Sequence, residues 1–182
     1  MHPIKRVAEF HTAFGHPISQ TPTPGGAELR EFRARILLEE VSELLQAMGV
    51  TATLTVGPAK VECEIIVQSC KEDHEIDLAN MAKETQDVSY VLEGNNLVFG
   101  MASDALGQLV HDSNMSRVGS DGKPILREDG KILKGPNFWR AEPEIQKVLD
   151  ICRKSKTNLL YANLEVIASA GRLLEESTNA EG

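Results

Sequence analysis

The stretch LLEEVSELLQAM, residues 37–48, combines a helical apolar pattern with three carboxylates and no basic residue. In a helix, side chains three or four positions apart share a face, so Glu40 and Glu43 project together and Glu39 lies above Glu43. Like charges at this spacing destabilise an isolated helix by roughly 0.2–0.5 kcal/mol per pair. The apolar side chains that predict the packed face of this helix are Phe32, Leu37, Val41, Leu44, Leu45 and Met48.

A second acidic pair lies on a later helical segment, KETQDV, where Glu84 and Asp87 are also three residues apart. Only two basic residues lie four positions from one of these carboxylates and can offset its charge. Arg35 can offset Glu39, and Lys83 can offset Asp87. Five carboxylates on two apolar helices therefore predict a cation from elsewhere. All-oxygen ligand sets suit Mg²⁺ or Mn²⁺, and no His lies three residues after a Glu, as a di-iron bundle would require. The alternative is an ordinary solvated acidic face.

Composition narrows the function further. The 182-residue chain has a formal net charge of -8, which repels nucleic acids and anionic membranes. It has no apolar signal core at its start and no run of about 20 apolar residues, so we expect a cytoplasmic protein with no membrane and no nucleic-acid partner. Cys63, Cys70 and Cys152 form no CxxC pair, and we expect all three to be reduced.

The pattern along the chain is mainly helical. Residues 51–70 differ, since β-branched residues alternate around Gly57 and Pro58 as in a hairpin. Residues 118–138 lack a helical period and predict a long loop or a loose hairpin. The predicted helices cover residues 1–14, 27–48, 76–100 with a break or bend at Gly94, 102–117, 143–153 and 157–176.

The acidic motifs resemble the signature of the all-α nucleoside triphosphate pyrophosphohydrolases, a group comprising MazG-like proteins, dimeric dUTPases and phosphoribosyl-ATP pyrophosphohydrolase. That signature is EExxE on one helix and ExxD on the next. FHTAFGHPISQTPT and VHDSNMSRVGSDGKPILREDGKILKGPNF resemble the dUTPase-like branch of the MazG proteins, and the resemblance covers about residues 6–140. Two departures are the forty residues between Glu43 and Glu84 and the presence of Arg117 where Lys is common.

The resemblance implies an all-α fold, a MazG-like helical bundle with a small β-hairpin insertion at about 51–70. Residues 1–140 would form the pyrophosphohydrolase domain. Residues 141–182 would form a C-terminal helical extension packed on the same domain or on a partner subunit. The active form implied is a homodimer or a dimer of dimers.

The activity implied is Mg²⁺-dependent hydrolysis of a nucleoside triphosphate to the monophosphate and pyrophosphate, with Mn²⁺ as a possible substitute and dUTP or a noncanonical nucleotide favoured. Glu40 and Glu43 would be catalytic, and Glu40 is favoured as general base. Two alternatives stay open: a non-catalytic helical binding or assembly module, and hydrolysis of phosphoribosyl-ATP or a signalling nucleotide on the same scaffold. The implied metal ligands are Glu39, Glu40, Glu43, Glu84 and Asp87.

The substrate contacts implied by the resemblance lie in two other segments. The base-pocket candidates are His11, Phe14 and Gln20, although the aromatic residues serve equally well as core and His11 as a surface residue. The basic residues of the later segment are interleaved with glycines, which let a backbone approach phosphate closely, and an ordinary solvated loop is the alternative. The candidates for binding substrate phosphate are Asn114, Arg117, Lys123, Arg127, Lys131 and Lys134.

Overall fold

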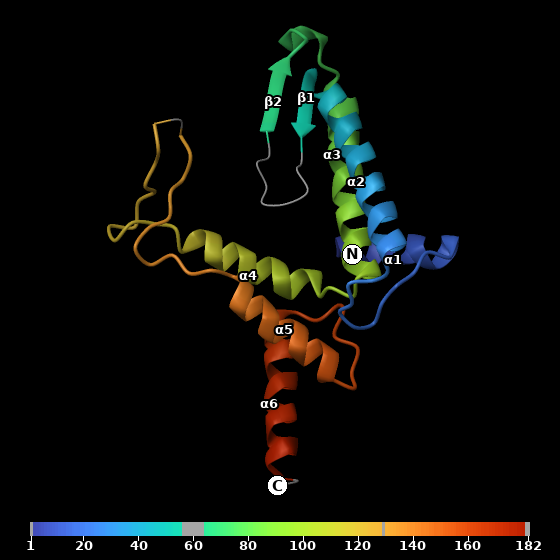
Figure 1. Ribbon diagram of the computed structural model, residues 1–182, viewed down its shortest axis with the longest axis vertical. Helices are drawn as coiled ribbons and strands as arrows, with labels where there is room; N and C mark the ends of the chain where they lie inside the picture. Colours follow the sequence, from blue (N-terminus) through green and yellow to red (C-terminus); the bar gives the residue numbers. More distant parts are fainter. Residues whose placement is uncertain (1, 56–63, 129, 181–182) are drawn as a thin grey trace. The chain divides into compact units, whose positions relative to one another are not determined.

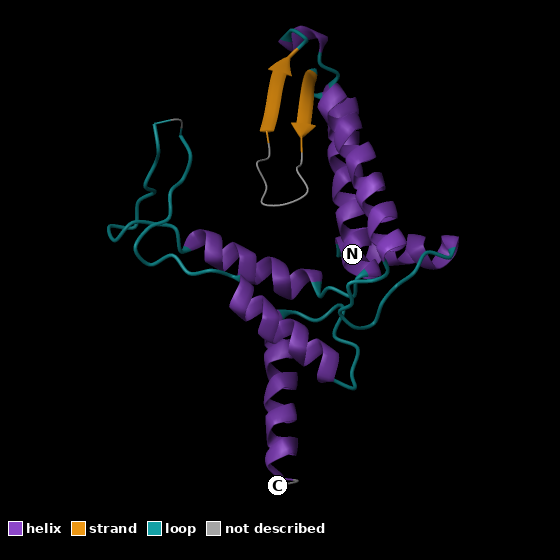
Figure 2. Ribbon diagram, in the orientation of Figure 1, coloured by secondary structure: helices purple, strands orange, loops and turns teal. Residues whose placement is uncertain are grey.

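The computed structural model describes residues 2–55, 64–128 and 130–180, and helices predominate in these ranges (Figure 1, Figure 2). The only strands described there form one antiparallel hairpin, so the predicted all-α class with a β-hairpin insertion is confirmed. The elements are α1 (Pro3–Phe14), α2 (Ala27–Ala47), β1 (Val50–Thr55), β2 (Glu64–Ser69), the 3-10 helix η1 (Asp73–Glu75), α3 (Leu78–Val98), α4 (Ser103–Met115), α5 (Glu142–Lys154) and α6 (Leu164–Ala180).

The chain divides into two compact units. The first consists mainly of Gly25–Asn95, and the second of Ile4–Pro24 and Asn96–Gly182. Helix α3 contributes to both units, with its last turn in the second. The domain boundary predicted at residue 140 stays a prediction.

In the first unit, α2 and α3 run side by side (Figure 1) and are tied together by Arg33. Its Nε donates to Oδ1 of Asn95 at 2.7 Å, and its Nη2 donates to the carbonyl oxygen of Val91 at 2.9 Å. Arg33 is only 6% exposed, and burial lowers its pKa. Because a buried guanidinium must have its donors satisfied, these two bonds fix how α2 lies along α3.

The hairpin joins α2 at Gly49. This residue has φ +67°, and a Cβ added to it would lie 2.6 Å from Cδ1 of Ile76 and 2.8 Å from Cβ of Lys71. Both the left-handed conformation and the lack of space therefore require glycine. Strand β1 pairs with β2 in a register that sets Val50 opposite Ser69. The expected turn around Gly57 and Pro58 lies outside the described residues.

The apolar face predicted for α2 is only partly buried. Phe32 and Met48 are 47% and 46% exposed, and the buried residues of α2 are Arg33 and Ala47. The physical reason is that two helices and one hairpin are too few layers to cover both faces of α2. The other large apolar side chains exposed in this unit are Leu38, Leu54, Ile66, Val67, Leu78, Tyr90 and Leu92.

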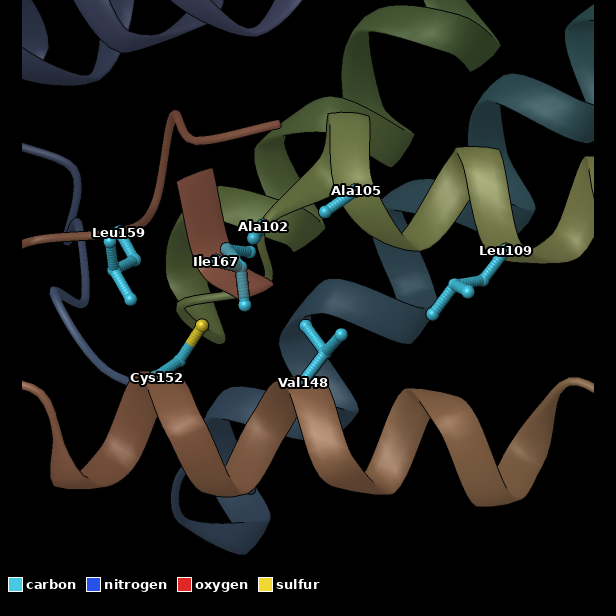
Figure 3. Close-up of a cluster of buried hydrophobic side chains, with 7 residues drawn as sticks. All are labelled: Ala102, Ala105, Leu109, Val148, Cys152, Leu159 and Ile167. Atoms are coloured by element: carbon cyan, nitrogen blue, oxygen red, sulfur yellow. The ribbon is translucent and has the colours of Figure 1, made fainter. Parts of the chain in front are cut away.

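The second unit has the larger apolar core, where α4, α5 and α6 meet (Figure 3). Ala105 and Ile167 are fully buried there, and Val148 points at them from α5. Burying a side chain the size of Ile167 stabilises a fold by about 1.5–3 kcal/mol. Cys152 is also in this core, and burial raises the pKa of its thiol. Cys70 and Cys152 form no disulfide among the described residues, and Cys63 lies outside them.

A smaller core lies at α1, where Ile4 and Val7 pack with Leu97 and Leu160. The chain after α1 is held to the end of α3 by main-chain hydrogen bonds, one of them from Ser19 N to the carbonyl oxygen of Leu97 at 2.9 Å. Gly100 permits this approach, because a Cβ there would lie 2.2 Å from the carbonyl oxygen of Thr21.

Of the break or bend predicted at Gly94, the structure shows no break, because α3 continues through this buried residue. Helix α6 begins at Leu164, seven residues later than predicted. Asn163 caps it, since its Oδ1 accepts from the main-chain N–H of Val166 at 3.0 Å. Leu159 is buried in the segment before the helix, so an apolar residue that fits the helical pattern serves instead as a core contact of a loop.

The described helices include none with the length and hydrophobicity needed to cross a bilayer.

Candidate functional site

The first unit brings carboxylates from two helices to one point. Glu40 projects from α2, and Glu84 and Asp87 project from α3. One oxygen of each of these three carboxylates lies within 4.8 Å of the other two. The arrangement follows from the sequence, because Glu84 and Asp87 are three residues apart and share one face of α3. We call these three residues the acidic cluster.

The acidic cluster disfavours its own negative charge. The pKa of Glu40 is raised from its ordinary value, first by burial and then by the negative charges of Glu43 and Asp87. Lys83 acts in the opposite direction, and Glu84 adds a smaller upward effect. A cation placed among these carboxylates would relieve both causes of the shift.

Glu84 is the most enclosed member of the acidic cluster. Its side chain is 8% exposed, and Nζ of Lys83 lies 3.1 Å from its Oε2. The same ammonium lies 2.8 Å from Oδ2 of Asp87. Hydrogen bonds to Asp87 and then to Glu84 raise the pKa of Lys83, so the lysine stays charged. The sequence spacing had predicted the Lys83–Asp87 contact, but not the contact of Lys83 with Glu84.

Glu43 and Glu39 are not members of the acidic cluster. A polar hollow of about 450 Å³ has both Glu43 and Glu84 in its wall, together with Lys71 and Asp77. A more open groove along α2, of about 700 Å³, has both Glu39 and Glu43 in its wall. Consecutive helical residues point about 100° apart, which explains why Glu39 and Glu40 face different surroundings.

The donor set fits a hard divalent cation. The three carboxylates of the acidic cluster supply oxygen ligands only, and Glu43 stands within reach of the hollow beside them. Oxygen-only, anionic sites favour Mg²⁺, Mn²⁺ or Ca²⁺ over Zn²⁺, which prefers nitrogen and sulfur. The residues that would hold the ion are therefore Glu40, Glu84 and Asp87, with Glu43 as the nearest further carboxylate.

Comparison with known families decides where this arrangement belongs. The sequence model of the phosphoribosyl-ATP pyrophosphohydrolase family matches residues 7–114, which is more than half of the chain and includes both acidic motifs. The chain belongs to this family. Its predicted membership of the all-α nucleoside triphosphate pyrophosphohydrolases is thereby confirmed.

One similar solved structure is that of a proposed NTP pyrophosphohydrolase from Exiguobacterium sp. 255-15. It shares 21% sequence identity with this chain, covers 85% of this chain and 99% of its own, and superposes with a TM-score of 0.41. No curated protein matches the sequence.

The basic residues follow the segment matched by the phosphoribosyl-ATP pyrophosphohydrolase model and lie in the second unit. Asn114 is exposed in the last turn of α4, and the loop beyond it forms a loose hairpin, one of the two forms that the sequence predicts (Figure 2). Among the described residues, a bridge between Leu126 and Ile132 pairs its two arms. The exposed basic side chains of this loop are Lys123, Arg127, Lys131 and Lys134.

Two cations of this loop share one aromatic ring. Cζ of Arg117 lies 5.6 Å from the centre of the Phe138 ring, and Nζ of Lys134 lies 4.5 Å from it. Nε of Arg117 is shielded from solvent and has no hydrogen-bond partner among the described residues. Two positive charges held on one ring make an electropositive point that an anion would stabilise.

The two ends of the loop are fastened to each other. The main-chain N–H of Gly135 donates to the carbonyl oxygen of Arg117 at 3.0 Å. A Cβ on Gly135 would lie 2.1 Å from the carbonyl oxygen of Val118, so only glycine fits. Next to this contact, Oγ of Ser113 donates to the carbonyl oxygen of Trp139 at 2.8 Å. The loop therefore starts and ends at one fixed place.

The three base-pocket candidates have different surroundings. His11 is 3% exposed, and its Nδ1 lies 3.0 Å from the carbonyl oxygen of Pro17, to which it donates. Phe14 is 68% exposed. Gln20 accepts a hydrogen bond from the side-chain amide of Asn158. Of the three, Phe14 presents the most free surface for stacking on a base.

Two residues that sequence reasoning left without a role stand beside the candidates. The ring of His16 is stacked on Phe10, with 5.8 Å between ring centres. Lys71 lines the hollow that also contains Glu43 and Glu84. His16 lies beyond the end of α1 and Lys71 beyond the end of β2, so neither stands at a helical or strand spacing that could have identified it.

Proposed function

We propose that the chain is a Mg²⁺-dependent nucleoside triphosphate pyrophosphohydrolase, which cleaves its substrate to a nucleoside monophosphate and pyrophosphate. The observation that supports this best is the meeting of Glu40, Glu84 and Asp87, from two helices, in a member of the phosphoribosyl-ATP pyrophosphohydrolase family. Three carboxylates this close together repel one another and destabilise the helices that carry them. A bound cation would remove this repulsion.

The chain's own residues have separable roles in this proposal. A bound Mg²⁺ would neutralise phosphate charge and lower the pKa of a coordinated water. Glu40, Glu84 and Asp87 would hold the ion, and Glu43 and Glu39 would complete the ligand set from the walls of the neighbouring hollows. Glu40 is the proposed general base, because a carboxylate at the ion lies within reach of a water that the ion coordinates.

The loop after α4 is proposed to bind the phosphates. Arg117 and Lys134 already share the ring of Phe138, so their charges are pre-oriented at one place. Asn114 begins this segment, and the lysines and Arg127 of the loose hairpin add charge farther along. A loop that binds phosphate in this way would also exclude water from the reaction.

The proposed substrate is dUTP or a noncanonical nucleotide, on the resemblance of residues 10–23 and of the KGPN loop to the dUTPase-like branch. Phosphoribosyl-ATP is the second candidate, because it is the substrate that the name of the matching family states. Both lose pyrophosphate by the same bond cleavage, so the choice rests on the base pocket, for which Phe14, His11 and Gln20 are the proposed residues.

The assembly proposed is a homodimer or a dimer of dimers. The first unit leaves Phe32, Leu38, Leu78 and Leu92 at 46–69% exposure on α2 and α3. Apolar side chains gathered on two neighbouring helices are typical of a surface that a partner covers. Light scattering on the purified protein measures the mass directly.

The test is an assay with separate nucleotides. Purified protein is incubated with dUTP, the other common deoxy- and ribonucleoside triphosphates, and phosphoribosyl-ATP, each with Mg²⁺ or with EDTA, and the products are separated by chromatography. The expected result is Mg²⁺-dependent release of a monophosphate and pyrophosphate from one or a few of them.

Other outcomes separate the alternatives. Release of single phosphates would contradict the proposed bond while keeping the metal site. Cleavage of phosphoribosyl-ATP alone would support the second candidate substrate. No turnover, combined with a melting temperature that ignores Mg²⁺ and a non-hydrolysable triphosphate, would favour a non-catalytic binding or assembly module.

A further inference from the structure

Lys83 forms ion pairs with two members of the acidic cluster. Its ammonium lies 2.8 Å from Oδ2 of Asp87, 3.1 Å from Oε2 of Glu84 and 3.2 Å from Oε1 of Glu84. Glu84 and Asp87 are two of the three proposed metal ligands. The lysine therefore occupies, with a single positive charge, oxygens that a divalent cation would use.

The side chain of Lys83 contacts these carboxylate oxygens from the solvent side and can move away from them. Adjacent residues of a helix point about 100° apart, so Lys83 must fold its stem back to touch the carboxylate of Glu84. The side chain of Lys83 is 60% exposed, whereas that of Glu84 is 8% exposed. The ammonium thus covers an enclosed carboxylate from the solvent side, and its flexible stem is free to turn outward at little cost.

A divalent cation and this ammonium cannot both use the same oxygens without strong repulsion. Two like charges a few ångströms apart repel, and a doubly charged ion gains more from three carboxylates than an ammonium gains from two. Lys83 is then left charged, exposed and next to the place where the substrate's phosphates arrive. Phosphate oxygens are the natural acceptors for its three N–H donors.

We infer that Lys83 is an internal counter-ion that leaves Glu84 and Asp87 when a divalent cation binds and then contacts the phosphates of the nucleotide. This inference rests on the proposed function. Without a divalent cation, Lys83 would offset the charge of the acidic cluster. With the cation and the nucleotide bound, the same residue would bind the phosphate chain.

The first test measures metal binding without nucleotide. Metal-free protein is titrated with Mn²⁺, and free Mn²⁺ is followed by its electron paramagnetic resonance signal, for the wild type, Lys83→Met, Lys83→Arg and Lys147→Met. Lys147 is a matched control, because its side chain is 68% exposed and pairs with Glu144 at 2.7 Å. Lys83→Met is expected to bind Mn²⁺ about two- to five-fold more tightly, whereas Lys83→Arg and Lys147→Met stay near the wild type.

The second test measures binding of a non-hydrolysable dUTP analogue to the same four proteins with Mn²⁺ present at saturation. Lys83→Met is expected to bind the analogue about three- to ten-fold more weakly, with Lys83→Arg restoring most of the loss. Lys147→Met should bind it as the wild type does. Thermal unfolding of each variant checks that the fold is kept.

Each contrary result has a distinct meaning. Equal Mn²⁺ affinity in the wild type and Lys83→Met would show that the lysine does not compete for the carboxylates, and would overturn the inference. Tighter Mn²⁺ binding with unchanged affinity for the analogue would overturn the contact with phosphate. A wild type that binds no Mn²⁺ would overturn the proposed metal site itself, and the inference with it.

Discussion

The acidic cluster and the basic loop, which is the segment from Arg117 to Lys134, carry opposite charges. The acidic cluster lies on helices, whereas the basic residues lie on a loop. Glu40, Glu84 and Asp87 stand on two long helices that Arg33 ties together, and one carboxylate oxygen of each lies within 4.8 Å of the other two. The basic residues stand on the loop after α4, along which Lys123, Arg127 and Lys131 are exposed. One region is thus rigid and crowded with like charge, and the other is open and spread out.

The proposed function accounts for this difference. A divalent cation needs several oxygens at nearly fixed separations, and helices supply such positions reproducibly. A phosphate chain is long and flexible, and cations spread along a loop can adapt to it. The crowding of the rigid region has an electrostatic cost: burial first, and then the negative charges of Glu43 and Asp87, raise the pKa of Glu40.

The largest effect is expected from the rigid region. Glu84→Gln should reduce turnover by about 100-fold or more, because it removes a charged ligand from the most enclosed position of the acidic cluster. Steady-state kinetics at saturating Mg²⁺ measures the loss, and circular dichroism checks the fold.

The matched control is Glu176→Gln, an exposed glutamate on α6. It should keep wild-type turnover. Full activity in Glu84→Gln would show that the acidic cluster is an ordinary solvated face, which is the alternative that its sequence leaves open.

An intermediate effect is expected at the fixed end of the basic loop. Gly135→Ala introduces a Cβ 2.1 Å from the carbonyl oxygen of Val118, so the loop's base must shift and carry Arg117 with it. The KM for the nucleotide should rise about ten-fold, the loss of one charge-assisted contact, while Mn²⁺ binding without nucleotide stays unchanged.

Gly107→Ala is the control for this variant. A Cβ at Gly107, within α4, meets nothing within 4 Å, and alanine is the better helix former. Its KM should match the wild type and its melting temperature should not fall. If Gly135→Ala weakens Mn²⁺ binding as much as nucleotide binding, the two regions are not separable in function.

The smallest effect is expected on stability without metal. The pKa of Glu40 is raised above its ordinary value of 4.5, so its contribution to stability is full below that pH and is lost as pH rises through the raised value. In EDTA at pH 7, Glu40→Gln should therefore melt about 1 °C higher than the wild type, a gain that saturating Mg²⁺ should reverse.

The check is to measure how the difference in melting temperature between Glu40→Gln and the wild type depends on pH. Near pH 4 the difference should vanish, because glutamine resembles the protonated acid. Glu31→Gln, an exposed position on the same helix, should show no such trend. A lower melting temperature for Glu40→Gln in EDTA would mean that the charge of Glu40 stabilises the metal-free fold.

Sequence predicted the rigid region better than the open one, for physical reasons. Helical spacing brings Glu84 and Asp87 to one face whatever surrounds them. The contact of Lys83 with Glu84, by contrast, depends on how a flexible side chain folds back. The start of α6 was missed because Leu159 fits a helical pattern while packing as part of a loop, and the exposure of Phe32 depends on how many layers cover α2.

The way the hairpin joins the rest of the first unit bears on how the chain tolerates insertions and deletions. The main-chain N–H of Cys70 donates to the carbonyl oxygen of Gly49 at 2.8 Å, so the chain leaves and re-enters the helical part of the first unit at one point. The entropic cost of closing a loop grows only slowly with its length. The hairpin is therefore free to lengthen, shorten or be exchanged in evolution and in the laboratory while Glu40 keeps its distance from Glu84.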